Sequence, residues 1–259
     1  MSEHPGCETG QPRGRNNSAA VRAALTMDQD ALRAAARAGA LFADLPENVA
    51  STLLDAATIR QVAPDTALFH QGDAPMHLLQ IVSGLVRLAQ INPDGLQTTL
   101  RIMRPGDLLG CVAVFQQFPY PATATALDDT LVLCWRSGQF LELMGRHPGI
   151  VNNALRVVGM RTRDMVQRVV EMSGRRVEQR VAAALLRLAG QAGMPTDDGI
   201  CIEYPVTRDD LAEMAGLTYF TISRALSKWQ KKGVLKSGRQ RMTILDRERL
   251  AHIAEGRDA

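Results

Sequence analysis

Basic side chains without acidic neighbours mark one stretch of this sequence. Between Met214 and Leu245 there is no Asp or Glu. The basic residues in that interval are Arg224, Lys228, Lys231, Lys232, Lys236, Arg239 and Arg241. Lys and Arg bind phosphate oxygens, and the Arg fork also matches the hydrogen-bond acceptors of guanine. A run of like charge often covers only a solvated surface, but its confinement to one short segment predicts a nucleic-acid contact.

A second set of residues could bind a metal. His70, His77 and Cys111 have side chains that can ligate iron, and we expect the two histidines on a strand and a turn. The simpler alternatives are a hydrogen-bonded surface histidine and a buried thiol that packs as a small apolar group. A cupin-like oxygenase would need several histidines and a carboxylate around one metal. The two histidines lie seven residues apart without a His-x-His pair, which disfavours that enzyme class.

The cysteines are Cys7, Cys111, Cys134 and Cys201, and they form no Cys-x-x-Cys pair. Such separated thiols do not match a disulfide framework, a structural zinc site or an iron–sulfur centre, so we expect free thiols in a reducing compartment. No apolar run reaches the about 18 residues of a membrane span, and the N-terminal segment has no secretory signal. We therefore expect a cytoplasmic protein without a membrane partner.

The composition is that of a globular protein, with 46% hydrophobic and 22% charged residues. Its 259 residues correspond to one large or two ordinary domains. The net charge of +3 is unevenly distributed: the first 140 residues carry 10 basic and 13 acidic side chains, and the others carry 20 and 14. The positive charge is thus concentrated in the half that holds the predicted nucleic-acid contact.

The elements that must position the basic residues form a compact pattern. Thr207 and Asp210 make a capping box that starts a helix, and this helix ends at Gly216. Thr218 caps a second helix directly afterwards. Two short helices joined by a tight glycine turn are a helix-turn-helix. Residues 236–245 follow as a basic β-hairpin, or wing.

Earlier in the chain, the periodicity changes from helical to strand-like. Residues 28–60 indicate short helices. Between Leu68 and Trp135, glycines spaced 12, 11 and 11 residues apart separate short apolar runs, which is typical of an antiparallel barrel or roll. The tetrapeptide at 92–95 predicts a tight turn. Gly174 is a candidate hinge before a helix over 177–189.

A heptad pattern links the strand-rich region to the helix-turn-helix. Its positions are Val151, Leu155, Val158, Thr162, Met165, Val169 and Met172, spaced alternately four and three residues apart. One interpretation is an amphipathic helix packed on its own domain. However, a second apolar side (Ile150, Ala154, Val157 and Val166) could face the roll while the heptad seam meets a partner helix. We favour a parallel homodimer through this helix.

The motifs together resemble the CRP/FNR superfamily of bacterial transcription regulators. The matching segments are LFHQGD (68–73), IVSGLVRL (81–88), RPGDLLG (104–110), ALDDT (126–130) and VTRDDLAEMAGLTYFTISRAL (206–226). The resemblance implies an α+β protein with a cyclic-nucleotide-binding-like β-roll, a long dimerisation helix and a C-terminal winged helix-turn-helix. It implies no catalytic activity.

The resemblance also implies an effector pocket, and this chain departs from its cyclic-AMP pattern. The cyclic-AMP-binding members have Gly-Glu-Leu followed by Arg-Ser-Ala in the phosphate cassette, whereas this chain has Gly110-Cys111-Val112 and Tyr120-Pro121-Ala122. Both charged groups are missing, and Met165 and Val166 replace a Thr and a Ser on the dimer helix. A buried phosphate without a cation is costly, so we do not expect cyclic AMP here. The candidate pocket residues are Gly110, Cys111, Tyr120, Pro121 and Ala122.

Other sensor types follow from the same comparison. The oxygen-sensing members hold a [4Fe–4S] cluster through an N-terminal cysteine cluster, but only Cys7 occurs there in this chain. The remaining details look like the nitric-oxide-responsive denitrification regulators of the NnrR type, for which haem has been proposed as the receptor. This resemblance makes His70, His77 and Cys111 the candidate haem ligands. An effector-free regulator of the same fold is the alternative.

In this family the second helix of the helix-turn-helix enters the major groove. The resemblance makes Arg224 the guanine reader, with Thr221, Ser223 and Lys228 nearby and Thr207, Arg208, Thr218 and Arg239 as further DNA contacts. Phe220 replaces a Glu that accepts hydrogen bonds from bases, and Tyr219 replaces a small or basic residue. Phe220 could pack on a thymine methyl, or both aromatics could be packing residues.

We therefore expect four segments. Residues 1–25 form a disordered tail, 26–145 a β-roll sensor, 146–173 a dimerisation helix and 174–255 the DNA-binding domain. The expected protein is a homodimeric regulator that reads palindromic promoter DNA with two recognition helices about 34 Å apart. Its expected partners are double-stranded DNA, a second copy of itself and RNA polymerase.

Overall fold

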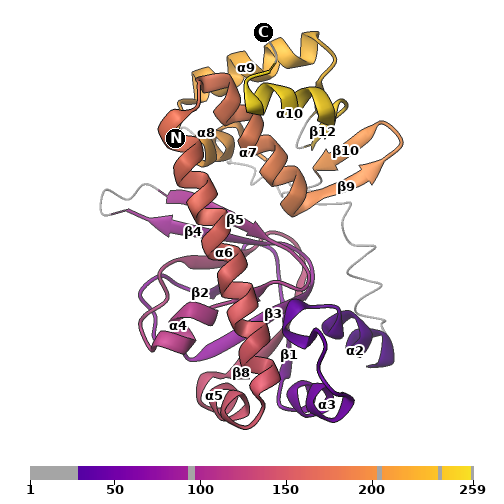
Figure 1. Cartoon of the computed structure of the whole chain (residues 1–259), viewed down its shortest axis with the longest axis vertical. Coiled ribbons are helices and arrows are strands. Elements are labelled where there is room, and N and C mark those ends of the chain that lie inside the picture. The colour runs from indigo at the N-terminus through magenta and orange to yellow at the C-terminus, as the bar shows by residue number, and fades with distance from the viewer. Residues whose placement is uncertain (1–28, 93–96, 203–205, 239–240, 258–259) are drawn as a thin grey trace, which may run out of the picture.

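The computed structural model describes residues 29–92, 97–202, 206–238 and 241–257. Within this range the strands form three four-stranded antiparallel sheets, two between residues 58 and 136 and one between residues 193 and 244. Figure 1 shows the two parts joined by one long helix. The expected tail, Cys7, most of the turn at 92–95 and Arg239 lie outside the described residues, and so does the side chain of Met172.

The first two sheets form the predicted β-roll. One has the strand order β1-β8-β3-β6 and the other has the order β2-β7-β4-β5. The strands are β1 (Thr58–Val62), β2 (Ala67–Phe69), β3 (His77–Ser83), β4 (Val86–Ile91), β5 (Gln97–Met103), β6 (Leu108–Leu109), β7 (Thr123–Ala126) and β8 (Thr130–Arg136). The roll begins earlier than predicted. Residues 58–60 are not helical, because Thr58 and Ile59 pair with the almost fully buried strand β8.

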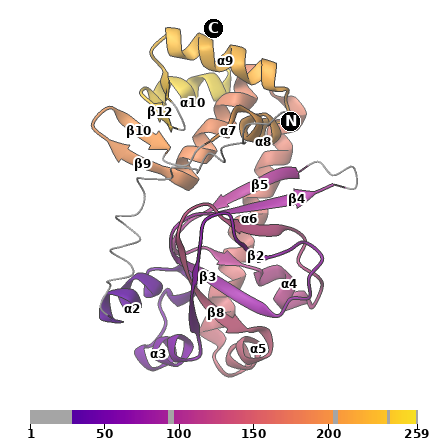
Figure 2. The same ribbon diagram turned by 180° about the vertical axis from the view of Figure 1, so that it is seen from behind.

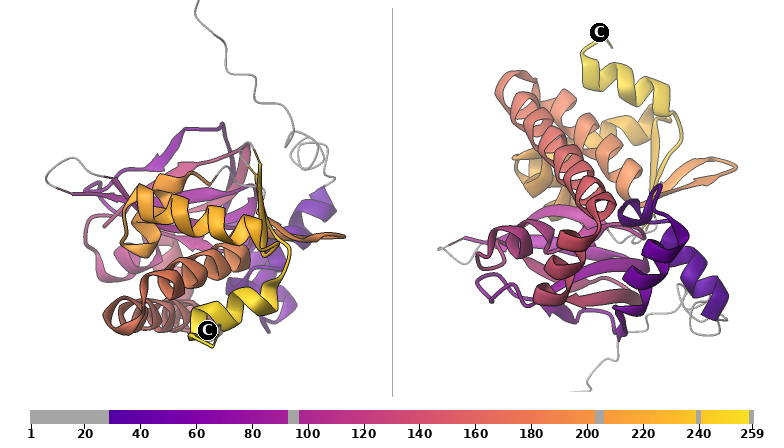
Figure 3. Two further views of the ribbon diagram at one scale, coloured as in Figure 1. Left: turned by 90° about the horizontal axis from the view of Figure 1, so that it is seen from above. Right: turned by 60° about the horizontal axis from the view of Figure 1, so that its bottom comes forward.

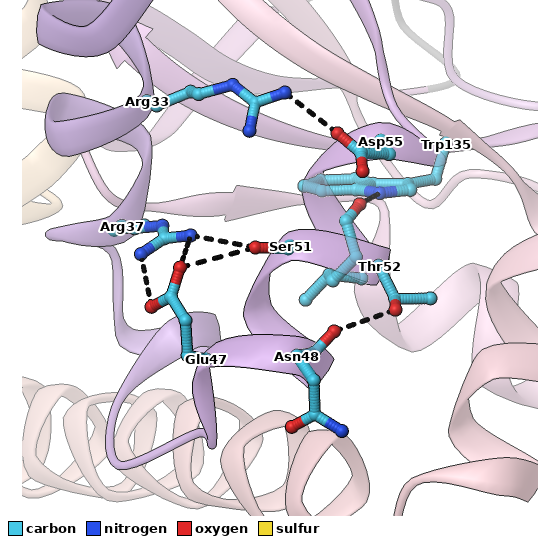
Figure 4. Close-up of polar contacts among 9 residues, drawn as sticks. Arg33, Arg37, Glu47, Asn48, Ser51, Thr52, Asp55 and Trp135 are labelled. Carbon is cyan, nitrogen blue, oxygen red and sulfur yellow. Dashed lines mark hydrogen bonds and ion pairs between the residues drawn. The ribbon is translucent and has the colours of Figure 1, made fainter.

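Short helices pack against strands β3 and β8 of the roll. They are α2 (Gln29–Arg37), η1 (Ala40–Phe42) and α3 (Glu47–Asp55). Figure 4 shows the polar contacts between α2 and α3: Arg33 pairs with Asp55 at 2.9 Å, and Arg37 donates two hydrogen bonds to Glu47. The indole N–H of the buried Trp135 donates to the carbonyl oxygen of Leu53 across 2.8 Å. The ion pairs hold α2 and α3 together, and the Trp135 contact fastens α3 to the central strand β8.

The long helix α6 (Pro148–Gly174) follows α4 (Cys111–Gln116) and α5 (Ser137–Arg146). Its first half packs on the roll through Ile150, Ala154 and Val157, which are buried as predicted. The Asn153 amide, also buried, donates to the carbonyl oxygens of Leu41 and Ala43. Val166 was expected on this roll-facing side, and that is wrong: 58% of it is exposed, because it comes nine residues after Val157 and so lies on the opposite side of α6.

The C-terminal part contains the predicted helix-turn-helix and wing. Its elements are α7 (Val177–Ala192), β9 (Gly193–Thr196), β10 (Gly199–Ile202), α8 (Arg208–Ala215), α9 (Tyr219–Lys231), β11 (Leu235–Gly238), β12 (Arg241–Ile244) and α10 (Arg247–Glu255). The hairpin β11–β12 extends into a sheet of order β11-β12-β10-β9. Its core gathers around Trp229, Leu185 and Leu188. None of the helices in the described ranges is long and apolar enough to span a membrane.

Candidate DNA-binding interface and effector pocket

A threonine side chain caps the start of each helix of the helix-turn-helix. The Thr207 hydroxyl accepts a hydrogen bond from the Asp210 N–H at 3.0 Å, and the Asp210 carboxylate accepts from the Thr207 N–H at 2.9 Å. This confirms the capping box that the sequence predicts. Gly216 ends α8 with φ of 61°, a left-handed conformation that glycine adopts without strain. The Thr218 side chain then accepts from the Thr221 N–H and starts α9.

One face of α9 is open to solvent and, apart from Phe220, polar. Ile222, Leu226 and Trp229 on the opposite face are buried. The open face lines a shallow pocket of about 700 Å³, formed by Phe220, Ser223, Arg224, Ser227, Lys228 and Lys231. These positions recur every three or four residues, so they lie on one side of the helix. Viewed from above in Figure 3, α9 lies across the top of the molecule.

Arginine side chains from α7 brace the turn between α8 and α9. Arg180 donates to the carbonyl oxygens of Ala215 at 2.6 Å and Gly216 at 2.8 Å. These carbonyls end α8 and have no partner within the helix. Lys228 forms an ion pair with Glu178 on α7 at 2.6 Å. The sequence pattern did not single out Arg180 or Glu178, because neither lies within the helix-turn-helix motif.

Aromatic and basic side chains meet where α9 begins. The Tyr219 hydroxyl accepts a hydrogen bond from Arg208 at 3.2 Å, and the Arg208 guanidinium also lies 5.9 Å from the centre of the Tyr219 ring. The Tyr219 and Phe220 rings meet edge to face, with centroids 5.8 Å apart. Further basic side chains are exposed near the end of α9 and on the wing: Lys231, Lys232, Lys236 and Arg241. Together these residues form a cationic surface around α9.

The candidate effector pocket is centred on Tyr120. Its ring is buried and stacks on Phe69 with centroids 3.9 Å apart. The Tyr120 hydroxyl donates to the His77 carbonyl oxygen at 2.6 Å and accepts from the His77 N–H at 3.0 Å. Burial raises the pKa of Tyr120, so it remains a neutral donor. A side chain in place of Gly110 would collide with the Tyr120 ring, so the ring fills the space beside the cassette glycine.

The other predicted pocket residues lie around this ring in different environments. Ala122 is buried and Pro121 is exposed. Cys111 is buried at the start of α4, and its sulfur accepts a hydrogen bond from Arg161 of α6 at 3.1 Å. Arg161 also donates to the Leu108 carbonyl oxygen. This link between α6 and the residues around Gly110 was not predicted from the sequence.

The two candidate histidine ligands lie in the opposite elements from those expected. His70, expected on a strand, follows β2 in an exposed turn, whereas His77, expected in a turn, is the first residue of β3. Partial burial, with help from Arg60 and Arg136, lowers the pKa of His77 and favours its neutral form. Among the described residues, no three His, Cys, Asp or Glu side chains gather in a group that could hold a metal ion. The convergent ligand set of a cupin-like oxygenase is therefore not found in these parts of the chain.

The heptad seam of α6 presents apolar side chains to solvent. Leu155, Met165 and Val169 are 62%, 66% and 64% exposed, and Thr162 is also exposed. Val151 and Val158 are partly buried. The seam thus covers the side of α6 that the roll leaves open. A row of exposed apolar residues this long indicates an interaction surface.

The C-terminal part rests on the edge strand of the roll. β5 lies at the end of its sheet, and Figure 2 shows it below α7 and α8. The buried Thr99 donates its N–H to Glu213 of α8 at 2.8 Å, and Ile102 donates its N–H to Gln191 of α7 at 3.4 Å. Arg104 donates to the Gly190 carbonyl oxygen at 2.9 Å. The N–H groups of Thr99 and Ile102 on the edge of β5 thus have hydrogen-bond acceptors in the C-terminal part.

Known families and proteins match both parts of this chain. The cyclic nucleotide-binding domain profile matches residues 59–147, and the Crp-like helix-turn-helix domain profile matches residues 179–253. The chain is 29% identical to the cyclic AMP receptor protein of Thermus thermophilus, over 73% of this chain and 84% of that protein. It is 27% identical to the CRP-like cAMP-activated global transcriptional regulator of Mycobacterium tuberculosis, over 72% and 84%. The structure of FixK2 from Bradyrhizobium japonicum is similar in fold, with a TM-score of 0.67, 23% identity and coverage of 76% and 96%.

Proposed function

Because this chain belongs to the CRP/FNR family of DNA-binding transcription regulators, we propose that it acts as a homodimer on palindromic promoter DNA. In this proposal a small effector other than cyclic AMP controls binding. RNA polymerase is its partner where it activates transcription. The observation that carries the proposal is the open face of α9, where Arg224 and its basic neighbours lie together on one side of the recognition helix.

The DNA-reading role follows from the chemistry of that face. Arg224 is exposed and lies one helical turn after Phe220, and an Arg fork can donate two hydrogen bonds to the O6 and N7 atoms of guanine. Lys231, Lys232, Lys236 and Arg241 surround the helix and contact phosphates in this proposal. Lys228 contributes less positive potential, because Glu178 is already bound to it. Arg224 therefore specifies the sequence, and the lysines supply affinity.

The homodimer follows from the exposed seam of α6. Two copies of α6 can bury Leu155, Met165 and Val169 against each other in parallel. Such a dimer relates two α9 helices by a two-fold axis, and the matching DNA is a palindrome with half-sites one helical turn apart. The proposed partner for this face is thus a second copy of the chain.

The exclusion of cyclic AMP rests on the cassette. Its phosphate would need a cation and hydrogen-bond donors, but Pro121 lacks an N–H and stands where the cyclic-AMP-binding members have a Ser after their Arg. Tyr120 packs on Phe69 in the adjoining space. One relative is named as cAMP-activated and another as a cyclic AMP receptor. The side chains of this cassette do not provide the recognition chemistry for cyclic AMP.

Nitric oxide sensing through haem is the finer proposal that the resemblance to the NnrR type suggests. The cassette does not fit a haem: Cys111 is buried and already bound by Arg161, and Tyr120 fills the space beside Gly110. His70, exposed on its turn, and the partly buried His77 are the remaining candidate ligands. A haem titration that gives no saturable Soret band leaves an effector of another kind or an effector-free regulator. A band that saturates at one haem per protomer supports the gas sensor.

The proposed switch passes through two contacts between the domains. An effector near Cys111 would move Arg161 and with it α6, while the β5 edge holds α7 and α8 directly. Both contacts can bias the equilibrium between two dimer geometries, which is how an effector controls a binding protein.

The DNA-binding proposal can be tested by incubating the full-length protein with sheared genomic DNA and sequencing the captured fragments. We expect enrichment of promoter fragments that share one inverted repeat. The variant Arg224→Ala is the matched control, and it should show weaker enrichment and no preference for guanine at one position of the repeat while keeping its fold. Equal capture of unrelated fragments by both proteins would contradict the proposal.

A further inference from the structure

Phe220 is placed where an aromatic ring does not stabilise the monomer. With 75% of its surface exposed, it is more exposed than any other large apolar side chain that the structure describes. A phenyl ring in water contributes little to the folding free energy, because that stabilisation comes from burying apolar area. The alternative that Phe220 is a packing residue therefore lacks support, and its role should be sought in a partner.

The ring is held from one side. Tyr219 meets it edge to face at 5.8 Å and 88°. Tyr219 is itself fixed by Arg208, which donates a hydrogen bond to the Tyr219 hydroxyl at 3.2 Å. The aromatic pair is thus anchored to α8, and the rest of the Phe220 ring remains free for contact. A side chain held in place before binding loses less conformational entropy when it binds.

The neighbours of Phe220 indicate what this partner is. It shares the open face of α9 with Ser223, Arg224 and Lys228, and it is the second residue of the helix. The first residues of a recognition helix are those that contact base edges. Phe220 therefore enters the major groove together with Arg224.

We infer that Phe220 selects a thymine in each half-site by packing on its C5-methyl group, beside the guanine that Arg224 binds. This inference rests on the proposed DNA-binding function and names one base of its target. The thymine methyl is an apolar group in the major groove. Opposite a phenyl ring, the amino groups of cytosine and adenine would lose a water acceptor without gaining another.

The test removes only that methyl group. Operator DNA selected by the full-length protein is synthesised with uracil in place of thymine, one position at a time in one half-site, and affinity is measured by fluorescence anisotropy. We expect one thymine whose replacement weakens binding about fourfold, as for the loss of one buried methyl contact. Thymines elsewhere in the same half-site are the internal controls and should show no change.

Variants assign the effect to Phe220. Phe220→Ala should bind the thymine and uracil operators equally, whereas Phe220→Leu should keep a preference for thymine. Arg224→Ala should weaken binding without changing the thymine-to-uracil ratio. Because Phe220 is exposed, these variants should fold, and circular dichroism checks that they do.

Two results would overturn the inference: wild-type protein that binds every uracil operator as well as thymine, or a Phe220→Ala variant that keeps the wild-type ratio. Failure of the wild-type protein to select any DNA sequence is a different result. It would overturn the proposed function itself.

Discussion

The N–H of Thr99 on the edge strand of the roll donates to the carboxylate of Glu213 on the first helix of the helix-turn-helix, across 2.8 Å. Thr99 is 2% exposed, so no water is available to replace Glu213 as its acceptor. Ile102, three residues further along the same strand, lies in the hydrophobic core of the C-terminal part. The two domains therefore share both a polar contact and a buried apolar one.

Glu213→Ala should leave the Thr99 N–H without an acceptor and lower the free energy of unfolding by about 1–3 kcal/mol. Glu213→Gln keeps an oxygen acceptor and should cost less. Hydrogen exchange at the Thr99 amide is the local measurement, and it should accelerate in the alanine variant only. Unchanged exchange in Glu213→Ala would show that this contact does not hold the domains together in solution.

Leu155→Asp should abolish dimerisation and operator binding together, because it places a charge in the exposed apolar seam of α6. Met160→Asp is a matched control: Met160 is also exposed, but it lies about 140° around the helix from Leu155. Light scattering measures the oligomeric state, and anisotropy measures operator affinity. A monomeric Leu155→Asp protein that binds the operator with wild-type affinity would refute the dimer mechanism.

Arg224 and Lys231 should differ in what their loss changes. Arg224→Ala should cost about 1–3 kcal/mol at the correct operator and remove the preference for guanine at one position per half-site. Lys231→Ala should weaken binding to all sequences alike and lower the salt dependence of the binding constant by about one unit. Measuring both variants against operators with single base changes separates the roles. An unchanged base preference in Arg224→Ala would disprove its role as the guanine reader.

The lowered pKa of His77 predicts a pH dependence of stability. Burial is the main cause, followed by the positive charges of Arg60 and Arg136. The folded protein then binds fewer protons than the unfolded chain, whose histidine pKa is about 6.5. The His77 contribution to the unfolding free energy is therefore present above that pH and is lost as the pH falls through the lowered pKa. Denaturation of wild type and His77→Gln at pH 7.5 and pH 5 measures it. A His77 pKa at or above 6.5 by NMR titration would contradict the prediction.

Local signals predicted much of this fold. The capping box of Thr207 and Asp210 and the end of α8 at Gly216 depend on contacts between residues close together in the sequence. Both could therefore be predicted from the sequence. The heptad seam is likewise a local repeat. Its exposed residues on α6, Leu155, Met165 and Val169, are among the positions spaced three and four residues apart in the sequence. The β9–β10 hairpin was missed because Pro195, Asp197 and Gly199 are typical of a loop. It exists because β10 pairs with β12, more than forty residues later in the chain.

The contacts that position the sites could not be predicted from the sequence. Glu213 and Thr99 are 114 residues apart, Arg161 and Cys111 are 50 apart, and Arg180 and Ala215 are 35 apart. Such pairs form when elements pack in three dimensions, and they leave no periodic pattern in one chain. The exposure of Phe220 could not be predicted for the same reason, because the sequence is compatible with both a packing role and a base contact.

In the proposed symmetric dimer, two α9 helices enter successive major grooves. The stoichiometry and footprint of the full-length protein on the operator that it selects test this arrangement. We expect two protomers per operator and two protected half-sites with centres about 10 base pairs, or roughly 34 Å, apart along one face of the duplex. A single protomer on an asymmetric site, or protection without sequence preference, would contradict it.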